Sequence, residues 1–155
     1  MRRRRRFLMT LAALFGTVTG AAAQGVTGPT LAEARAALAA AEETATGLGV
    51  GLSCAVVDAR GTLVALARMD NARYFTADVA AGKARASAAF GAPSGNLARL
   101  AELRLDSVVD GGKMLFVQGA VPIAKDGQTV GAIGCSGASA QQDEDAANAG
   151  VAAIQ

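Results

Sequence analysis

The stretch Val121–Gly137, VPIAKDGQTVGAIGCSG, predicts two short strands joined by a tight turn at Asp126-Gly127. An Asp-Gly pair between apolar runs is a strong signal of a β-hairpin, because this turn needs positive φ at both central positions. The second strand carries three glycines at three-residue spacing: Gly131, Gly134 and Gly137. Glycines inside a strand mark a bulge, a bend or a close approach of another backbone, so we expect a helix or a second subunit to pack closely on this hairpin.

The chain around this hairpin predicts further helices and strands. Helices are expected over 31–46, 77–90, 94–103 and 140–154, and strands over 51–58, 63–69, 114–118, 121–124 and 130–136. Thr30 with Glu33, and Ser139 with Gln142, have the spacing of capping boxes, and Thr76 is expected to cap the helix 77–90. Hairpin connections between these strands favour an α+β layered domain with a mostly antiparallel five-stranded sheet covered by helices.

Residues 1–23 have the features of a signal peptide. Arg2–Arg6 form a basic segment, an apolar run follows from Phe7 to about Val18, and Ala21–Ala23 supplies small residues for cleavage after Ala23. The apolar run is too short for a good membrane span, although a retained anchor is the alternative. The arginines before Phe7-Leu8 also fit a twin-arginine signal, so both the general secretory and the twin-arginine routes remain open. We expect a periplasmic or secreted protein.

The charge of the predicted mature chain, 24–155, excludes one class of partner. The full sequence has 15 Lys and Arg against 13 Asp and Glu, and five of the basic residues lie in Arg2–Arg6. The mature chain therefore keeps ten basic and thirteen acidic residues, a formal net charge of −3. With no cluster of Lys or Arg in the mature chain, nucleic acid is not an expected partner. Its length fits a single domain.

Two cysteines, Cys54 and Cys135, lie in predicted strands. An exported protein with an even number of cysteines is compatible with a disulfide, provided that the two strands are neighbours. We favour the alternative of two free, buried cysteines, since free Cys commonly behaves as a small apolar residue.

Six segments in order resemble the GlcG/HbpS-like haem-binding family. They are Val56-Val57-Asp58 with Gly61, Arg68-Met69-Asp70, Gly82–Ala86, Phe90–Pro93, Gly119–Ile123 and Gly131–Gly134 with Ser136-Gly137. The similarity covers nearly all of residues 30–155. This resemblance implies a profilin-like layered fold, assembly into homo-oligomers and haem as the cofactor. It assigns no catalytic residue.

The sequence contains no histidine, the commonest haem ligand. If haem binds, the candidate ligands are the phenol of Tyr74, the thioether of Met69 or Met114, a thiolate of Cys54 or Cys135, and the hydroxyl of Thr76. Tyr74 is our candidate for the metal, because tyrosine is an established type of haem ligand. The alternatives are structural: Tyr74 with Phe75 forms an aromatic lid over the core, and the methionines are core residues.

Basic residues near Tyr74 are candidates for binding carboxylates. Tyr74, Lys83 and Arg85, the latter two on the helix 77–90, could bind carboxylates such as haem propionates through charge-assisted hydrogen bonds. Arg68, at the end of a strand, is a candidate for binding an acidic small molecule. The alternatives are that Lys83 and Arg85 are solvated helix charges and that Arg68 and Asp70 form a structural ion pair. A second hypothesis, a binder or enzyme for a small carboxylate metabolite, uses the same residues, Arg68, Tyr74 and Lys83. Asp58 is expected to close its own turn.

Overall fold

The computed structural model describes residues 28–155, and the predicted signal peptide lies outside these residues. The strands are β1 (Ser53–Asp58), β2 (Leu63–Arg68), β3 (Ala120–Lys125) and β4 (Gln128–Ser136), and the helices are α1 (Leu31–Gly47), α2 (Thr76–Phe90), α3 (Ala98–Glu102) and α4 (Ala140–Ala152). Short 3₁₀ turns lie on either side of α3, at Ser94–Leu97, Leu105–Ser107 and Val109–Gly112.

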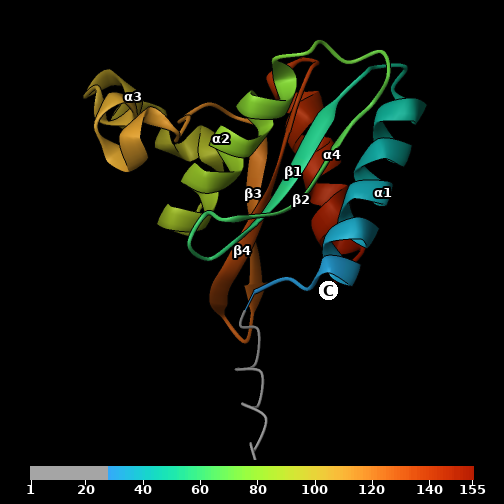
Figure 1. The fold of residues 1–155 in the computed structure, drawn as a ribbon, viewed down its shortest axis with the longest axis horizontal. Helices are drawn as coiled ribbons and strands as arrows, with labels where there is room; N and C mark the ends of the chain where they lie inside the picture. Colours follow the sequence, from blue (N-terminus) through green and yellow to red (C-terminus); the bar gives the residue numbers. More distant parts are fainter. Residues whose placement is uncertain (1–27) are drawn as a thin grey trace, which may run out of the picture.

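The sheet is antiparallel throughout, with strand order β2-β1-β4-β3. α1 and α4 cover one face, and α2 covers the other (Figure 1). Because side chains alternate along a strand, β1 contributes to both layers. Val56 packs with α1 and α4, whereas Ala55 and Val57 pack against α2. The α+β layered fold is therefore confirmed, with four strands instead of five.

The β3–β4 hairpin forms as predicted. Asp126 and Gly127 have φ of 51° and 75°, the positive values that this tight turn requires. Gly134 faces α2 so closely that a Cβ there would lie 2.5 Å from the Ala80 carbonyl oxygen and 2.8 Å from the Ala84 nitrogen. The strand glycine therefore allows helix α2 to pack directly on the sheet, as expected.

Both predicted capping boxes are present, at Thr30 with Glu33 and at Ser139 with Gln142. The ammonium of Lys125 and the hydrogen bonds from Thr30 lower the pKa of Glu33 from 4.5 to about 2. The prediction for Thr76 is wrong, because this residue lies inside α2 and does not cap it. Its hydroxyl donates to the Arg73 carbonyl and contacts the buried Ser53 hydroxyl at 2.7 Å.

The predicted strand 114–118 is absent, and a loop packed on α2 takes its place. The Leu115 N–H donates to the Gly82 carbonyl of α2, and the Val117 carbonyl accepts from the Ser94 hydroxyl. The nearest atom to a Cβ on Gly82 would be Leu115 Cγ, at 2.8 Å. The backbone of this apolar segment is thus satisfied by a helix and a side chain, which removes the need for a strand partner.

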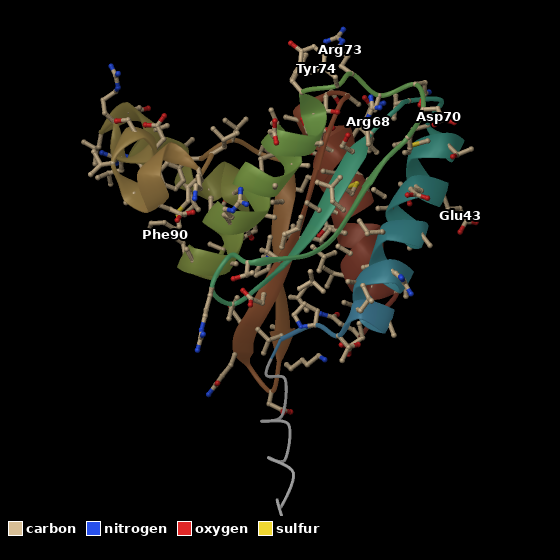
Figure 2. The ribbon with its side chains drawn as sticks, in the orientation of Figure 1. Glu43, Arg68, Asp70, Arg73, Tyr74 and Phe90 are labelled. Atoms are coloured by element: carbon tan, nitrogen blue, oxygen red, sulfur yellow. A yellow bond between two sulfur atoms is a disulfide. The ribbon has the colours of Figure 1, made fainter. Side chains whose placement is uncertain are left out.

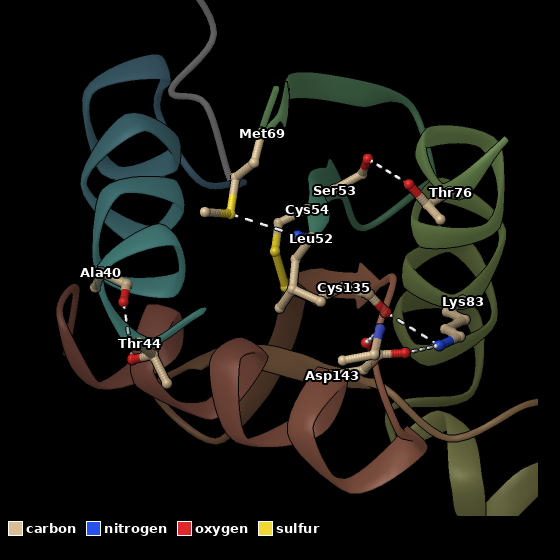
Figure 3. Close-up of a disulfide and its surroundings, with 11 residues drawn as sticks. Ala40, Thr44, Leu52, Ser53, Cys54, Met69, Thr76, Lys83, Cys135 and Asp143 are labelled. Atoms are coloured by element: carbon tan, nitrogen blue, oxygen red, sulfur yellow. Dashed lines mark hydrogen bonds and ion pairs between the residues drawn. A yellow bond between two sulfur atoms is a disulfide. The ribbon is translucent and has the colours of Figure 1, made fainter. Parts of the chain in front are cut away.

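Cys54 and Cys135 form a disulfide, so the preference for free cysteines is wrong (Figure 3). The two residues lie directly opposite each other on β1 and β4, with a Cα–Cα distance of 4.1 Å. The Cys135 N–H donates to Gly119 on the β3 side, so this is the closer, non-hydrogen-bonded kind of antiparallel pair. Only the sheet order brings the two thiols together across 81 residues of sequence.

Candidate functional site

The loop between β2 and α2 carries two adjacent, exposed aromatic side chains. Tyr74 is 84% exposed and Phe75 is 44% exposed. Their rings meet edge to face, with centroids 5.6 Å apart. The hypothesis of an aromatic lid over the core is therefore wrong, because the Tyr74 ring projects into solvent.

The loop backbone is held in place by three anchors. Arg68 donates from Nη1 to the Ala72 carbonyl at 3.1 Å, and Thr76 donates to the Arg73 carbonyl at 2.7 Å. At the start of the loop, the Leu52 N–H donates to the Met69 sulfur at 3.4 Å. These bonds order the backbone, so that exposed side chains between the anchors project from a defined surface.

Four of the five predicted binding residues gather at this end of the sheet: Arg68, Met69, Tyr74 and Thr76. Figure 2 shows Arg73 and Tyr74 at the top of the molecule, with Arg68 nearby. Arg73, which was not among the predicted residues, adds a second exposed guanidinium beside the phenol. No motif marks Arg73 in the sequence, and it stands out only because its neighbours are candidate ligands.

The four residues differ in what they could offer a ligand. The phenol of Tyr74 is open to solvent, whereas Thr76 is 2% exposed and its hydroxyl is engaged inside the fold. The Met69 sulfur already accepts a backbone hydrogen bond. The predicted ion pair between Arg68 and Asp70 is wrong, since within residues 28–155 the ion pairs are Lys83–Asp143 and Lys125–Glu33.

Lys83 lies away from the loop, in the interior between α2 and α4 (Figure 3). Its ammonium donates to an Asp143 carboxylate oxygen at 2.8 Å and to the Cys135 carbonyl at 3.1 Å. The other carboxylate oxygen of Asp143 accepts from the Ala138 N–H at 3.0 Å. Lys83 is therefore not a solvated helix charge, and its side chain links α2, β4 and α4. Asp143 was missed as its partner because 60 residues separate the two.

A cavity lies beside α3, away from the β2–α2 loop, in a region where the sequence predicted no site. This cavity of about 520 Å³ is lined by Asn96, Phe116, Gln118 and Glu144, together with small residues of the 94–101 segment. Its volume is in the range of small-molecule pockets. Its lining comes from three separate segments, so no sequence spacing could have indicated it.

The β2–α2 loop and the end of β2 thus offer a phenol, a phenyl ring and two guanidinium groups on one ordered surface. Guanidinium groups bind carboxylates in bidentate fashion, and aromatic rings pack against planar apolar ligands. Within residues 28–155, no three His, Cys, Asp or Glu side chains gather into a group that could hold a metal ion. On this surface the Tyr74 phenol is the side-chain group that could donate to a metal.

Known proteins resemble this chain in fold and in sequence. The family model described as "Haem degrading protein HbpS-like" matches residues 30–152. Protein GlcG of Escherichia coli (strain K12) is 34% identical over 111 residues, which cover 66% of this chain and 77% of GlcG.

Two solved structures extend the comparison. A double mutant of Streptomyces reticuli HbpS superposes with a TM-score of 0.76 at 33% identity, covering 97% of this chain and 99% of that one. A structure titled as a PduOC:heme complex superposes with a TM-score of 0.75 at 28% identity, covering 83% and 96%. The resemblance to the GlcG/HbpS-like family is confirmed, and the chain belongs to the family of HbpS-like haem degrading proteins.

Proposed function

We propose that this protein is an exported, homo-oligomeric haem-binding protein whose β2–α2 loop receives the haem. The observation that carries the proposal is the phenol of Tyr74, 84% exposed on an ordered loop beside Arg68 and Arg73. The HbpS-like family and the haem complex of a 28%-identical neighbour support haem as the ligand class.

The donor set of the chain favours Tyr74 as the iron ligand. The sequence has no histidine, and both cysteines are joined in a buried disulfide. The Met69 sulfur and the Thr76 hydroxyl are already engaged, and Met114 packs with the buried Phe116 and Leu97. Tyrosine is a natural haem ligand, so the residues present fit the group without a histidine.

The propionates of the haem are assigned to Arg68 and Arg73. Lys83 was a candidate for this role, but it is 3% exposed and already bonded to Asp143 and Cys135. The two arginines are exposed, and only one bond from Arg68 to the Ala72 carbonyl occupies them within the described chain. When bound, haem would supply the redox chemistry of its iron, while the loop residues bind and orient it.

A second copy of the chain completes the proposed site. Small-molecule sites commonly bury most of their ligand, and the Tyr74 side chain stands on an open surface. One protomer would therefore cover one face of the porphyrin, and a neighbouring protomer would cover more. The open position of Tyr74 thus supports the homo-oligomer that the family resemblance implied.

Export is supported by two features of the chain. Residues 1–23 match a signal peptide with cleavage after Ala23, and the Cys54–Cys135 disulfide fits an oxidising compartment such as the periplasm. Within residues 28–155, no helix combines the length and the apolar character needed to cross a bilayer.

A haem titration of the mature chain from Gln24, followed by absorbance, tests the proposal. We expect a saturable Soret shift in the wild type and at least a tenfold weaker affinity in Tyr74→Phe, which keeps the ring and loses the oxygen. Phe90→Leu is the matched control, because it alters an exposed aromatic on another part of the surface (Figure 2). An unchanged affinity and spectrum in Tyr74→Phe would remove Tyr74 from the site, and a non-saturating wild type would end the haem proposal.

A small carboxylate metabolite is the second candidate ligand, favoured by the exposed Arg68 and Arg73 and by the lack of histidine. Thermal-shift measurements with small mono- and dicarboxylates would distinguish it. Stabilisation that is lost in an Arg68→Gln, Arg73→Gln double variant, without a saturable Soret shift in the wild type, would make it the better assignment.

A further inference from the structure

The two edge strands of the sheet differ in how they are protected. Exposed edges invite pairing with another chain, and proline, lysine and bulges are the usual protection. β3 carries Pro122 and Lys125, and its pairing with β4 is interrupted by an irregularity between Ile123 and Ala124. β2 reads Leu-Val-Ala-Leu-Ala-Arg, without proline or lysine, and its first charged residue is Arg68 at its end. The pairing of β2 with β1 is also irregular, between Val56 and Val57, so Val64 has no partner in the ladder. The unprotected part of the β2 edge is therefore the regular stretch from Ala65 to Arg68.

The backbone of β2 presents hydrogen-bonding groups to the open edge at Leu66. Cys54 and Cys135 form a non-hydrogen-bonded pair, so Cys54 directs its backbone groups toward its β2 partner, Ala67. The alternation of the ladder then turns the N–H and C=O of Leu66 away from β1. Leu66 is also 38% exposed. It pairs with Ala55, whose side chain packs against α2, so the Leu66 side chain lies on the α2 face of the sheet.

On the opposite face, α1 lies beside the same edge and carries a symmetric charge pattern. A groove of about 390 Å³ is lined by Ala65, Leu66 and Ala67 of β2 and by Leu31, Arg35, Leu38, Ala39 and Glu42 of α1. Arg35 and Glu42 stand at equal distances in sequence from the midpoint between Leu38 and Ala39. If a second α1 ran antiparallel across that midpoint, each Arg35 would face a Glu42.

We propose that the β2 edge and the adjoining face of α1 form a two-fold interface with a second copy of this chain. The two β2 strands pair antiparallel about Leu66, which joins the two sheets into one. Both α1 helices then lie on the same face of the joined sheet, with reciprocal Arg35–Glu42 ion pairs. This inference names the surface of the proposed oligomer, and it does not depend on haem.

The register has a consequence for the candidate site. Pairing about Leu66 places Ala67 opposite Ala65 of the second copy, because the residue numbers of antiparallel partners have a constant sum where the pairing is regular, and Arg68 follows directly after Ala67. The β2–α2 loop begins directly after Arg68, so the interface would lie beside the loop that carries Tyr74. The second protomer would thus approach the surface assigned to haem.

Sedimentation velocity of the mature chain from Gln24, without haem, tests the interface. We expect the wild type to assemble as a dimer or a multiple of dimers, and Leu66→Lys to halve the number of subunits, because two ammonium groups would meet at the two-fold axis. Leu103→Lys is the matched control, an exposed leucine just after α3 that should leave the assembly unchanged. A monomeric wild type, or a Leu66→Lys variant that assembles like the wild type, would overturn the proposal.

A charge exchange tests the helix contact separately. Arg35→Glu alone and Glu42→Arg alone each place like charges opposite one another, so each should weaken self-association at least tenfold. Equimolar mixing of the two variants restores both opposite-charge pairs and should recover the dimer as a heterodimer. If the mixture stays as weakly associated as each variant alone, the reciprocal pairing is wrong. A wild-type dimer that does not bind haem would count against the proposed function and would not affect the proposed interface.

Discussion

The two ion pairs of the described chain join similar groups and differ in burial. Lys83 and Asp143 meet at 2.8 Å with each side chain 4% exposed. Lys125 and Glu33 meet at 2.5 Å with side chains 40% and 29% exposed. Both acids stand near the start of a helix that opens with a capping box. Surface pairs typically contribute about 0–1 kcal/mol, whereas removing one partner of a buried pair costs several times more. Burial therefore determines which pair the fold depends on.

The largest effect should come from breaking the buried pair. Asp143→Ala leaves the Lys83 ammonium in the interior without its carboxylate, so we expect a loss of about 3–5 kcal/mol in the free energy of unfolding. Urea denaturation followed by circular dichroism measures it. Glu33→Ala, which breaks the exposed pair and also removes a capping-box group, is the comparison and should lower the free energy of unfolding clearly less than Asp143→Ala. Equal losses in the two variants would show that burial does not separate the pairs.

Replacing both members of the buried pair should recover part of that loss. Lys83→Met with Asp143→Leu removes both charges together, and apolar replacements of buried pairs are often neutral or stabilising. The Ala138 N–H and the Cys135 carbonyl would lose their side-chain partners, so a net cost of about 1–3 kcal/mol should remain. Urea denaturation again reports the value, and a double variant less stable than Asp143→Ala would contradict this account.

Gly119 tests how tightly the backbone fits over the buried pair. A Cβ there would lie 2.6 Å from the Lys83 nitrogen and 2.9 Å from Asp143 Cβ, and the residue has φ of 129°. We expect Gly119→Ala to cost about 1–3 kcal/mol more than Gly127→Ala. Gly127 also has positive φ, 75°, but a Cβ there would meet nothing within 4 Å, so Gly127→Ala measures the cost of positive φ without a steric contact. Thermal unfolding of both variants measures the difference in stability. Equal losses of stability in the two variants would mean that Lys83 and Asp143 can move aside for the added methyl group without cost.

The smallest effect concerns pH and the exposed pair. The pKa of Glu33 is lowered to about 2, so its contribution to stability is present above its ordinary pKa of 4.5 and is lost as the pH falls from 4.5 to about 2. The difference in Tm between the wild type and Glu33→Gln should therefore shrink over that range. Glu43→Gln, on the same helix and exposed, is the control. A difference that stays constant down to pH 2 would contradict the lowered pKa.

Local chemistry allowed much of the fold to be predicted from the sequence. The Asp126-Gly127 turn and both capping boxes depend on residues within a few positions of each other, and the structure contains all three. Asp58 closes its own turn as predicted, accepting from the N–H groups of Arg60 and Thr62. Such features need no distant partner, so a pattern of neighbouring residues is sufficient to find them.

The predictions that failed concern residues whose partners are distant in sequence. The apolar segment 114–118 had the pattern of a strand, but Gly82 and Ser94 satisfy its backbone instead. Lys83 looked like a surface charge because its helix position was known and Asp143 was not. The same limit applies to the candidate site. Tyr74 and Arg68 could be chosen as candidates from the sequence, whereas the exposure of Tyr74 and the burial of Thr76 could not be predicted from it.

The sequence by itself determined most of the helices and strands, the Asp126-Gly127 turn, the two capping-box helix starts and the family, because these depend on short-range steric and hydrogen-bonding preferences and on ordered segments. Tertiary structure alone decided the Cys54–Cys135 disulfide, the Lys83–Asp143 pair and the open β2 edge. Each of these arises from strand order and layer packing, which bring together residues up to 81 positions apart. The physical reason is that burial, and with it the strength of a charge or the availability of a thiol, is a property of the assembled layers and not of any segment alone.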